Sequence, residues 1–391
     1  MDLSNNICKI KVVGVGGGGN NAVNRMVNAG ITGAYFVAVN TDQQDLNMSR
    51  ADETIQIGKT LTKGLGAGAN PDRGREAAEE SVEDLKRMLQ GTDLLFITAG
   101  LGGGTGSGAA PVIARLAKEM GILTIGVITK PFKFEAPTRS RNADNSIDEL
   151  RKYVDSLVVI PNEKLYTILK KDVSFLDSFR YADDVLRQAI QGVSELISVP
   201  GLINLDFADV STIMRDKGIA HMGIGKGRGA NKTIEAVRQA VTSQLLETSI
   251  EGATGILINI TGGRDLTLSE VYEAVDLVRD VADKDCNIIF GARINNDTTG
   301  ETEITVIATG FADDKLKKPE AVPQFKDNSA NVRPFTESVK PQDQEEVKEE
   351  QHEEPVKPAE PEDEVQDISI KAKKPFLSDD DLPPFLRKLK R

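Results

Sequence analysis

Residues 100–114, GLGGGTGSGAAPVIA, contain six glycines in their first nine positions. The stretch follows the apolar run LLFIT, which is typical of a buried strand, and continues into AAPVIARLAKEM, which has the pattern of a helix. Glycine has no Cβ, so the backbone N–H groups of such a loop can approach a ligand closely. The N-terminus of the following helix adds positive potential. The stretch therefore predicts a phosphate-binding loop, with a tight turn and close helix packing as the alternative interpretation.

The first half of the chain alternates between short apolar runs and helical patterns. Most of the runs are continuously apolar, as expected of parallel strands that helices cover on both faces. This alternation predicts an α/β fold with a doubly wound parallel sheet. The predicted strands span residues 10–15, 35–40, 54–58, 94–99, 123–128 and 156–161.

Glycine-rich or polar segments follow the predicted strands at their carboxyl ends. Besides residues 100–108, the segment GVGGGGNN (14–21) follows the first strand, and GLGAGANP (64–71) comes a few residues after the third. Ligands bind at this edge of open α/β sheets. Three phosphate-binding loops at one edge favour a nucleoside triphosphate, because its row of phosphates needs contacts from several loops.

One alternative is an NAD(P)-dependent oxidoreductase. Gly14, Gly16 and Gly19 match the pattern G-x-G-x-x-G between a strand and a helix, and Asp42 lies near the position of an acidic residue that binds ribose. This interpretation accounts for one glycine-rich loop and leaves the other two unexplained. A filament-forming nucleotide-binding protein that does not hydrolyse its nucleotide is a further alternative.

The composition disfavours several classes of function. The chain has 391 residues and a net charge of −12, so we do not expect it to bind nucleic acid, which requires positive charge. Cys8 and Cys286 are far apart in the sequence, which disfavours a disulfide framework or a thiolate metal site. His221, which we predict to lie in a loop, and His352 are the two histidines. The N-terminus lacks a signal-peptide pattern, and we expect a cytoplasmic protein.

Residues 175–198 predict a long amphipathic helix that Pro200 and Gly201 end. Its apolar stripe, which we expect to pack in the core, consists of Phe175, Phe179, Ala182, Leu186, Ile190, Val193 and Ile197.

Two aspartates follow this helix. Asp206 and Asp209 are three residues apart and share a helix face, although Asp206 would also serve as an ordinary N-cap. From Asp183 to Val199 the helix rises by about 24 Å. Residues 201–311 predict a second α/β region, with a capping box at TLSE (267–270).

The segment GGGTGSG (102–108) is the signature of the tubulin/FtsZ family, and residues 8–311 resemble that family nearly without gaps. Other matching segments are GVGGGGNNAVNRM, NTDQQDL, GLGAGANP, FRYADDVLRQAIQGVSELI, NLDFADV and the terminal DDLPPFLRKLKR. The resemblance implies a GTPase that assembles head to tail into filaments. It also implies a place in the division ring at mid-cell in bacteria.

The resemblance implies the residues of the nucleotide site. Asp183 is implied to bind the guanine edge, but Asp184 beside it leaves open which carboxylate faces the base. Ala136 stands where the family usually has glycine. We expect Mg²⁺ on the β- and γ-phosphates, held mainly by phosphate oxygens and water, without a dedicated set of protein ligands. The residues implied to contact GTP are Gly17, Gly18, Gly19, Asn20, Asn21, Ala69, Asn70, Gly103, Gly104, Thr105, Gly106, Glu135, Arg139 and Asp183.

The resemblance assigns catalysis to Asn204, Asp206 and Asp209, which orient the attacking water. If Asp183 binds the base, the long helix places Asp206 too far away to reach the same nucleotide's γ-phosphate. The aspartates can instead reach the nucleotide of the next subunit in a head-to-tail filament, a contact that builds open polymers.

The predicted organisation of the chain combines composition with the resemblance. The acidic, proline-rich part cannot bury enough apolar surface to offset its ordering entropy, so we predict a disordered linker. The terminal peptide is implied to bind partner proteins that tether the filament to the membrane, so membrane contact is only indirect. The predicted units are a GTP-binding domain (1–174), a central helix (175–199), a catalytic-loop domain (200–311), the linker (312–376) and the terminal peptide (377–391).

Overall fold

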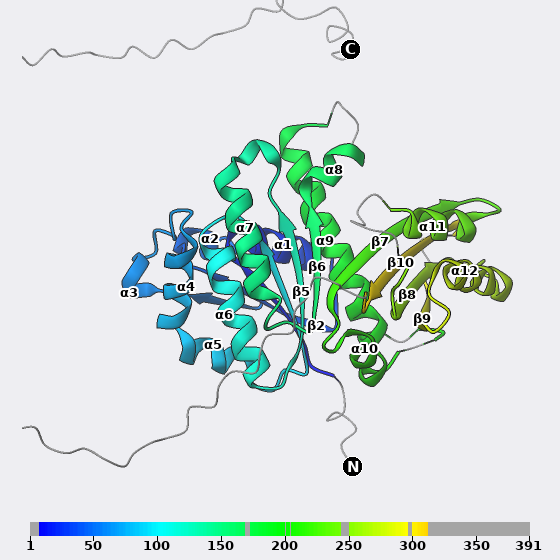
Figure 1. The fold of residues 1–391 in the computed structure, drawn as a ribbon, viewed down its shortest axis with the longest axis horizontal. Helices are drawn as coiled ribbons and strands as arrows, with labels where there is room; N and C mark the ends of the chain where they lie inside the picture. Colours follow the sequence, from blue (N-terminus) through cyan, green and yellow to red (C-terminus); the bar gives the residue numbers. More distant parts are fainter. Residues whose placement is uncertain are drawn as a thin grey trace, which may run out of the picture. The chain divides into compact units, whose positions relative to one another are not determined.

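Six parallel strands of the computed structural model form a sheet in the order β3-β2-β1-β4-β5-β6 (Figure 1). Each begins and ends within two residues of a predicted strand, so the predicted parallel α/β sheet is confirmed. The strands are β1 Ile10–Val15, β2 Ala34–Asn40, β3 Glu53–Gln56, β4 Leu94–Gly100, β5 Leu123–Lys130 and β6 Ser156–Pro161.

The structure describes residues 8–168, 173–199, 201–203, 205–243, 250–295 and 299–311. All of them belong to one unit, Met1–Lys318. Asn204 and the predicted linker and terminal peptide lie outside the described residues. Within the described ranges, no helix is both long enough and apolar enough to cross a membrane.

Helices cover both faces of the parallel sheet, because successive side chains of a strand point to opposite faces. Val12 and Val13 are neighbours on β1 and belong to two different hydrophobic clusters. The Val12 cluster includes residues of α1 (Gly16–Asn28), α9 (Phe175–Ser198) and α10 (Phe207–Met214). The Val13 cluster includes residues of α4 (Pro71–Glu80), α5 (Val82–Leu89), α6 (Thr105–Glu119) and α7 (Pro137–Leu150).

The strand order changes direction between β1 and β4, which lie side by side. The helix after β1, α1, packs on one face of the sheet, and the helix after β4, α6, packs on the other. A crevice between such diverging connections is where ligands bind in doubly wound folds. Four short helices border the same edge: α2 Gln43–Asn47, α3 Lys59–Thr62, η2 Lys133–Glu135 and α8 Asn162–Ile168.

β7 (Gly218–Arg228) is a strand, so the prediction that His221 lies in a loop is wrong. Gly223 and Gly227 lie on the face of this strand that meets α11 (Lys232–Val241). A Cβ on Gly223 would lie 1.9 Å from the Ala240 carbonyl oxygen, and a Cβ on Gly227 would lie 1.8 Å from the Lys232 carbonyl oxygen. The glycines let the helix backbone pack directly on the strand. A glycine-rich pattern that suggests a loop is here a packing surface.

β7 also joins the first sheet to the remaining strands. Its first three residues pair parallel with β6, and the strand from His221 onwards pairs antiparallel with β10. The order continues as β7-β10-β8-β9. The capping box at Thr267 and Glu270 is confirmed. The domain boundaries predicted within residues 1–311 stay predictions. The other elements are β8 Gly255–Gly262, α12 Leu268–Val281, β9 Asn287–Ile294 and β10 Glu301–Thr309.

The long helix α9 has the predicted bounds, and the Ser174 side chain caps it by accepting from the Asp177 N–H. Most of its predicted apolar stripe is buried, but Phe175 is 68% exposed and does not belong to the core. Phe175 is the first residue of the helix, and its ring contacts those of Phe134 and Phe179.

Candidate functional site

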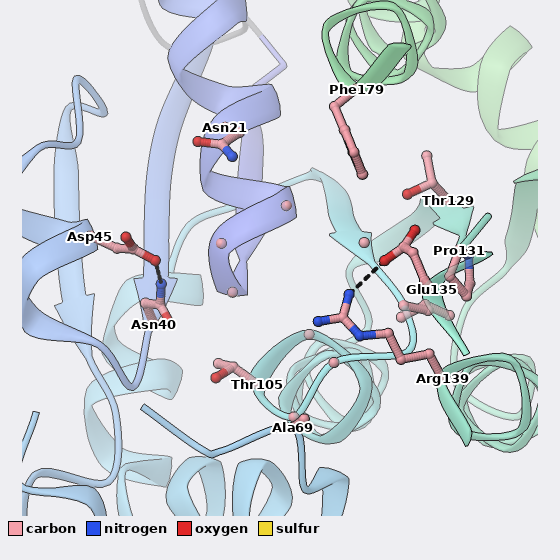
Figure 2. A pocket seen from close by; sticks show the side chains of 18 of the residues that line it. Asn21, Asn40, Asp45, Ala69, Thr105, Thr129, Pro131, Glu135, Arg139 and Phe179 are labelled. Atoms are coloured by element: carbon pink, nitrogen blue, oxygen red, sulfur yellow. Dashed lines mark hydrogen bonds and ion pairs between the residues drawn. The ribbon is translucent and has the colours of Figure 1, made fainter. Parts of the chain in front are cut away.

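A cavity of about 600 Å³ opens at the carboxyl edge of the parallel sheet (Figure 2). Its wall contains residues that end or follow five strands, including Gly16 after β1, Asn40 on β2 and Thr129 on β5. Eleven of the fourteen residues predicted to contact GTP line it: Gly17, Gly18, Asn21, Ala69, Gly103, Gly104, Thr105, Gly106, Glu135, Arg139 and Asp183. One cavity therefore brings together all three glycine-rich segments.

The loop between β4 and α6 owes its shape to close backbone contacts. A Cβ on Gly104 would lie 2.9 Å from the Asn70 backbone nitrogen, and a Cβ on Gly106 would lie 2.8 Å from the Gly100 carbonyl oxygen. Larger residues do not fit at these two positions. Thr105 begins α6, so the first N–H groups of this helix have no partner within the helix, and Gly104, Thr105 and Gly106 line the cavity.

Ser107 lies in the same glycine-rich stretch and holds the loop from within. Its hydroxyl accepts a hydrogen bond from the Gly102 N–H at 2.8 Å, and the residue does not line the cavity. Pro111 has no N–H, so the Ser107 carbonyl lacks its usual helical partner. The Ser146 hydroxyl of α7 donates to that carbonyl at 2.8 Å. Ser107 thus holds the loop and links α6 to α7.

The segment GGGGNN, predicted to belong to a phosphate-binding loop, is instead the first part of α1. Gly19 packs against β4: a Cβ there would lie 2.4 Å from the Thr98 carbonyl oxygen. Asn20 is buried, and its side-chain nitrogen and oxygen have no partner among the described residues. Gly19 and Asn20 do not line the cavity, whereas Gly17, Gly18 and Asn21 do.

The segment 64–70 approaches the cavity with an unusual backbone. Ala69 has φ of 58°, in the left-handed region that few residues other than glycine adopt. The Asn70 side chain accepts from the N–H groups of Asp72 and Arg73 and caps α4. Ala69 lines the cavity, but Asn70 does not, because its side chain is turned to the helix.

Glu135 and Arg139 form an ion pair on the cavity wall (Figure 2). One Glu135 oxygen lies 2.5 Å from an Arg139 nitrogen, and the other accepts from the Phe132 N–H at 2.9 Å. Ala136 lies between them with φ of 97°, a strained value for a residue with a Cβ. The pair therefore closes over a strained turn between η2 and α7.

Asp183 lies on α9, on the same cavity wall as Phe179 and Ala182. Arg25 of α1 donates from Nε to its Oδ2 at 3.0 Å. Burial raises the pKa of the Asp183 carboxyl, and the hydrogen bond and charge of Arg25 oppose this. Asp184 does not line the cavity and accepts from Arg187 and Gln188. Of the two carboxylates, Asp183 is therefore the one that faces the cavity.

The cavity wall also contains three polar residues for which the sequence predicted no role, Asn40, Asp45 and Asn162. Asn162 follows β6 and is only 5% exposed, and its Oδ1 has no partner among the residues described. Asn40, Asp42 and Asp45 come from the end of β2 and from α2, and the Asn40 amide donates to Asp45 at 3.2 Å. Their signal is their place directly after a strand. Asp42, considered as a ribose ligand, also caps α2 through the Gln44 N–H.

Asp206 and Asp209 do not line the cavity. They form the capping box of α10, in which each carboxylate accepts a hydrogen bond from the other residue's backbone N–H. The second oxygen of each carboxylate has no partner in the described part of the chain. The N-cap role is thus present, and it leaves one oxygen on each side chain for another contact.

Comparison with known proteins gives consistent matches. The model of the Tubulin/FtsZ family GTPase domain matches residues 9–170, and that of the FtsZ family C-terminal domain matches residues 218–312. The structure of an empty FtsZ dimer from M. jannaschii is 46% identical, covers 79% of this chain and 90% of its own, and has a TM-score of 0.76.

More distant structures share the fold. GDP-bound monomeric CetZ1 from Haloferax volcanii is 24% identical, covers 77% of this chain and 94% of its own, and has a TM-score of 0.67. The GTPgS-bound protofilament of CetZ2 from the same organism is 23% identical, covers 77% of this chain and 92% of its own, and has a TM-score of 0.65.

Proposed function

The chain belongs to the tubulin/FtsZ family and is a GTPase, and from this premise we propose that it polymerises head to tail and completes hydrolysis between neighbouring subunits. The filaments would form the division ring at mid-cell of a bacterial cell. Family membership excludes the NAD(P)-dependent oxidoreductase. Self-association is supported by the dimer and protofilament among the similar structures.

We assign the phosphates to the two glycine-rich helix starts. The N-terminal turns of α1 and α6 converge on the cavity with Gly17, Gly18, Gly104 and Thr105 in its wall. Unpaired N–H groups and the positive ends of two helices attract a row of phosphate oxygens. Glycine at these positions lets the ligand approach the backbone.

We assign the ribose and the base to the opposite wall. Glu135 and Arg139 offer a carboxylate and a guanidinium for hydroxyl and phosphate oxygens. Asp183 accepts hydrogen bonds from the N1–H and N2–H₂ groups of guanine, while adenine N1 is itself an acceptor. Phe179 and Asn162 belong to the same wall. We assign the Phe179 ring to an apolar contact with the nucleotide and the Asn162 side chain to a polar contact with it.

The cavity has suitable donors for Mg²⁺. Hard oxygen ligands and water suit this ion, and the Thr105 hydroxyl and the Asp42 and Asp45 carboxylates all lie in the wall. These residues would hold it, mainly through water and phosphate oxygens. Bound there, the ion neutralises charge on the β- and γ-phosphates. The described residues contain no group of three or more His, Cys, Asp or Glu side chains suited to a metal.

The separation of Asp209 from the cavity carries the proposal. Asp183 lines the cavity from the third turn of α9, and from there to Ser198 the helix rises by about 22 Å. Asp206 and Asp209 begin α10 beyond that end. The chain's own aspartates therefore do not reach its own nucleotide, and a second copy must supply them.

The chemistry at such a contact needs little from the protein. A water attacks the γ-phosphorus, the bond to the β-phosphate oxygen breaks, and GDP and phosphate leave. The free oxygens of Asp206 and Asp209 accept hydrogen bonds from that water and align it. Asn204, outside the described residues, is proposed to act with them.

The terminal peptide, residues 377–391, is proposed to bind partner proteins that hold the filament at the membrane. It lies outside the described residues. In the sequence, Phe385 and Leu386 follow a Pro-Pro pair and precede basic residues. Two apolar side chains are too few for stable membrane binding, so a protein partner is required.

Light scattering and phosphate release, followed together after GTP addition over a series of protein concentrations, test the proposal. Both signals should rise from zero above the same threshold concentration, because hydrolysis requires contact between subunits. A rate per molecule that stays constant below and above the threshold of scattering would show that one chain suffices.

A further inference from the structure

Arg25 lies in the last turn of α1 and is not part of the cavity wall. Its Nε donates to Oδ2 of Asp183 at 3.0 Å, across 158 positions of the sequence. The Asp183 side chain is 18% exposed and that of Arg25 is 34% exposed. The two side chains therefore form a half-buried ion pair directly behind the carboxylate that faces the cavity.

The helix that carries Arg25 also forms the other end of the cavity. Gly17, in the first turn of α1, lines the cavity, and Arg25 lies about 12 Å further along the helix axis. One rigid element thus connects the phosphate side to the carboxylate on α9. The position of Asp183 relative to the phosphates is fixed through this helix.

Few charges act on the Asp183 carboxyl. Burial raises its pKa, the hydrogen bond and charge of Arg25 lower it, and neighbouring Asp184 raises it. Arg25 is the one ionisable residue of α1, whose sequence is otherwise GGGGNNAVNMVN. On the cavity wall, Glu135 and Arg139 pair with each other. Arg25 is therefore the cation that opposes both burial and the charge of Asp184.

We propose that Arg25 is a specificity-determining positioning residue, which holds the Asp183 carboxylate as an anion oriented toward the guanine edge. Arg25 does not touch the base. It occupies one carboxylate oxygen from behind and fixes the side-chain rotamer, so that acceptor positions remain for N1–H and N2–H₂. The inference rests on the proposed role of Asp183 in binding guanine.

Removal of the guanidinium has a definite chemical consequence. Without it, burial and Asp184 both favour the protonated carboxyl. A protonated carboxyl donates through its O–H and accepts through its C=O, which suits the N1 acceptor and N6 amino group of adenine. Loss of Arg25 should therefore weaken GTP binding and reduce discrimination against ATP, and both effects should grow as the pH falls.

The test measures the affinity of the full chain for GTP, ITP and ATP by titration, in the wild type, Arg25→Gln and Arg25→Lys. ITP lacks the N2 amino group, so the ratio of GTP to ITP affinity reports the second hydrogen bond. Arg187→Gln is the matched control, because Arg187 pairs with Asp184, which does not line the cavity. Thermal melting of each variant checks that it folds.

Arg25→Gln should bind GTP about tenfold more weakly than wild type near neutral pH, the size expected for a charge-assisted hydrogen bond. Its GTP affinity should fall further as the pH is lowered, because no cation then opposes the effect of burial on the pKa of the Asp183 carboxyl, whereas the wild type changes less. Arg25→Lys should remove the pH dependence, because lysine retains the positive charge. It should recover only part of the affinity, because lysine lacks the planar guanidinium that orients the carboxylate. The control Arg187→Gln should match the wild type.

The outcomes separate this inference from the proposed function. A wild type without preference for GTP over ATP would overturn the role of Asp183 itself. A wild type that prefers GTP, with Arg25→Gln equal to it in affinity, in GTP-to-ITP ratio and at each pH, would overturn only the role of Arg25. If Arg25→Gln fails to fold, the GTP-to-ITP ratio of Arg25→Lys decides, because an unchanged ratio contradicts the proposed orientation by the guanidinium.

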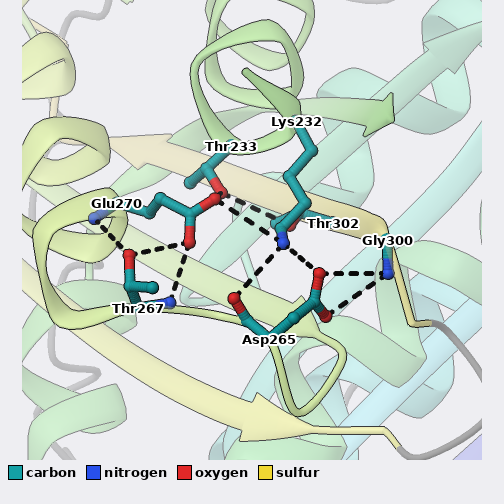
Figure 3. A network of polar contacts seen from close by, with 7 residues as sticks. All are labelled: Lys232, Thr233, Asp265, Thr267, Glu270, Gly300 and Thr302. Carbon is teal, nitrogen blue, oxygen red and sulfur yellow. Dashed lines mark hydrogen bonds and ion pairs between the residues drawn. The ribbon is translucent and has the colours of Figure 1, made fainter. Parts of the chain in front are cut away.

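A separate polar network, centred on Lys232 and Asp265, lies at the start of α11 and outside the nucleotide cavity (Figure 3). Lys232 is buried and pairs with Asp265 and Glu270, and Asp265 also accepts from the Gly300 N–H. Its charges are satisfied within the chain, so the network ties the loops around β8 and β10 together and does not present a ligand site.

Discussion

The hydroxyl oxygens of Thr41 and Thr105 lie 2.7 Å apart, and both side chains are buried. Thr105 begins the phosphate-side helix α6, and Thr41 directly follows β2. The Thr62 hydroxyl donates to the Thr41 carbonyl at 3.2 Å, so the contact continues toward α3. The start of α6 is therefore anchored from a neighbouring loop and does not depend on its own glycines alone.

Thr41→Val should weaken this anchor. The change leaves the Thr105 hydroxyl without its partner in a buried place, which costs about 1–3 kcal/mol. We expect a lower melting temperature and a several-fold rise in the KM for GTP. Thr41→Ser keeps the hydroxyl, so its melting temperature and KM should stay near those of the wild type. Steady-state kinetics and thermal melting measure these effects. An unchanged KM in Thr41→Val would mean that the hydroxyl contact does not position the loop.

The sequence predicted the sheet and α9 well because their signals are local. Continuous apolar runs define buried parallel strands, and a 3.6-residue period defines α9. β7 was mispredicted because Gly223 and Gly227 suggest a loop when the helix that packs on them is unknown. Their role depends on α11, which a local pattern does not contain.

The residues of the site likewise fall into those that a local sequence pattern predicts and those that it does not. The glycine-rich loops were predictable because several glycines close together, between a strand and a helix, are typical of phosphate-binding loops. Asn40, Asp45 and Asn162 are single polar residues, and only the parallel order of β2, β4 and β6 brings them to one cavity. The ion pair of Arg25 and Asp183 joins distant segments and leaves no sequence pattern.

Ala136→Gly should stabilise the protein. Ala136 has φ of 97° and ψ of 146°, a region that glycine adopts freely, and a residue held there costs about 1–3 kcal/mol. The gain is partly offset by the greater chain entropy of glycine when unfolded. Chemical denaturation without nucleotide should therefore show an increase of about 1 kcal/mol in the free energy of unfolding.

The control for this prediction is the same substitution elsewhere in the adjoining helix. Ala143→Gly, inside α7, should destabilise by about 1 kcal/mol or more, because glycine lowers helix stability and the site is buried. A destabilised Ala136→Gly variant would show that the turn at Ala136 carries no strain.

Thr105→Arg should abolish nucleotide binding in a folded protein. Thr105 is 9% exposed and lines the cavity beside the start of α1, so a long side chain must extend into the space assigned to the phosphates. Overpacking costs about 1–3 kcal/mol, which a domain of this size tolerates. Titration with GTP and circular dichroism measure both properties. GTP affinity near that of the wild type would place the phosphates elsewhere.

Asp209→Ala should retain GTP binding and assembly but lose hydrolysis. Asp209 lies outside the cavity wall, so the chain's own nucleotide does not lose a contact. The variant also loses the side chain that accepts from the Asp206 N–H, at a cost of about 0.5–2 kcal/mol. Asp209→Asn is the control for stability, because its amide oxygen still accepts that bond while the charge is gone.

Mixing two inactive variants tests whether hydrolysis occurs between subunits. Asp209→Ala holds GTP but offers no Asp209 to its neighbour, whereas Thr105→Arg offers Asp209 but holds no GTP. When a Thr105→Arg subunit adds to the end of an Asp209→Ala filament, its Asp206 and Asp209 should lie over the neighbour's GTP. Phosphate release should then return in the mixture and not in either variant alone. Normal hydrolysis by Asp209→Ala alone, or wild-type activity at full rate in monomers, would instead leave Asp206 and Asp209 with only their observed role as the capping box of α10.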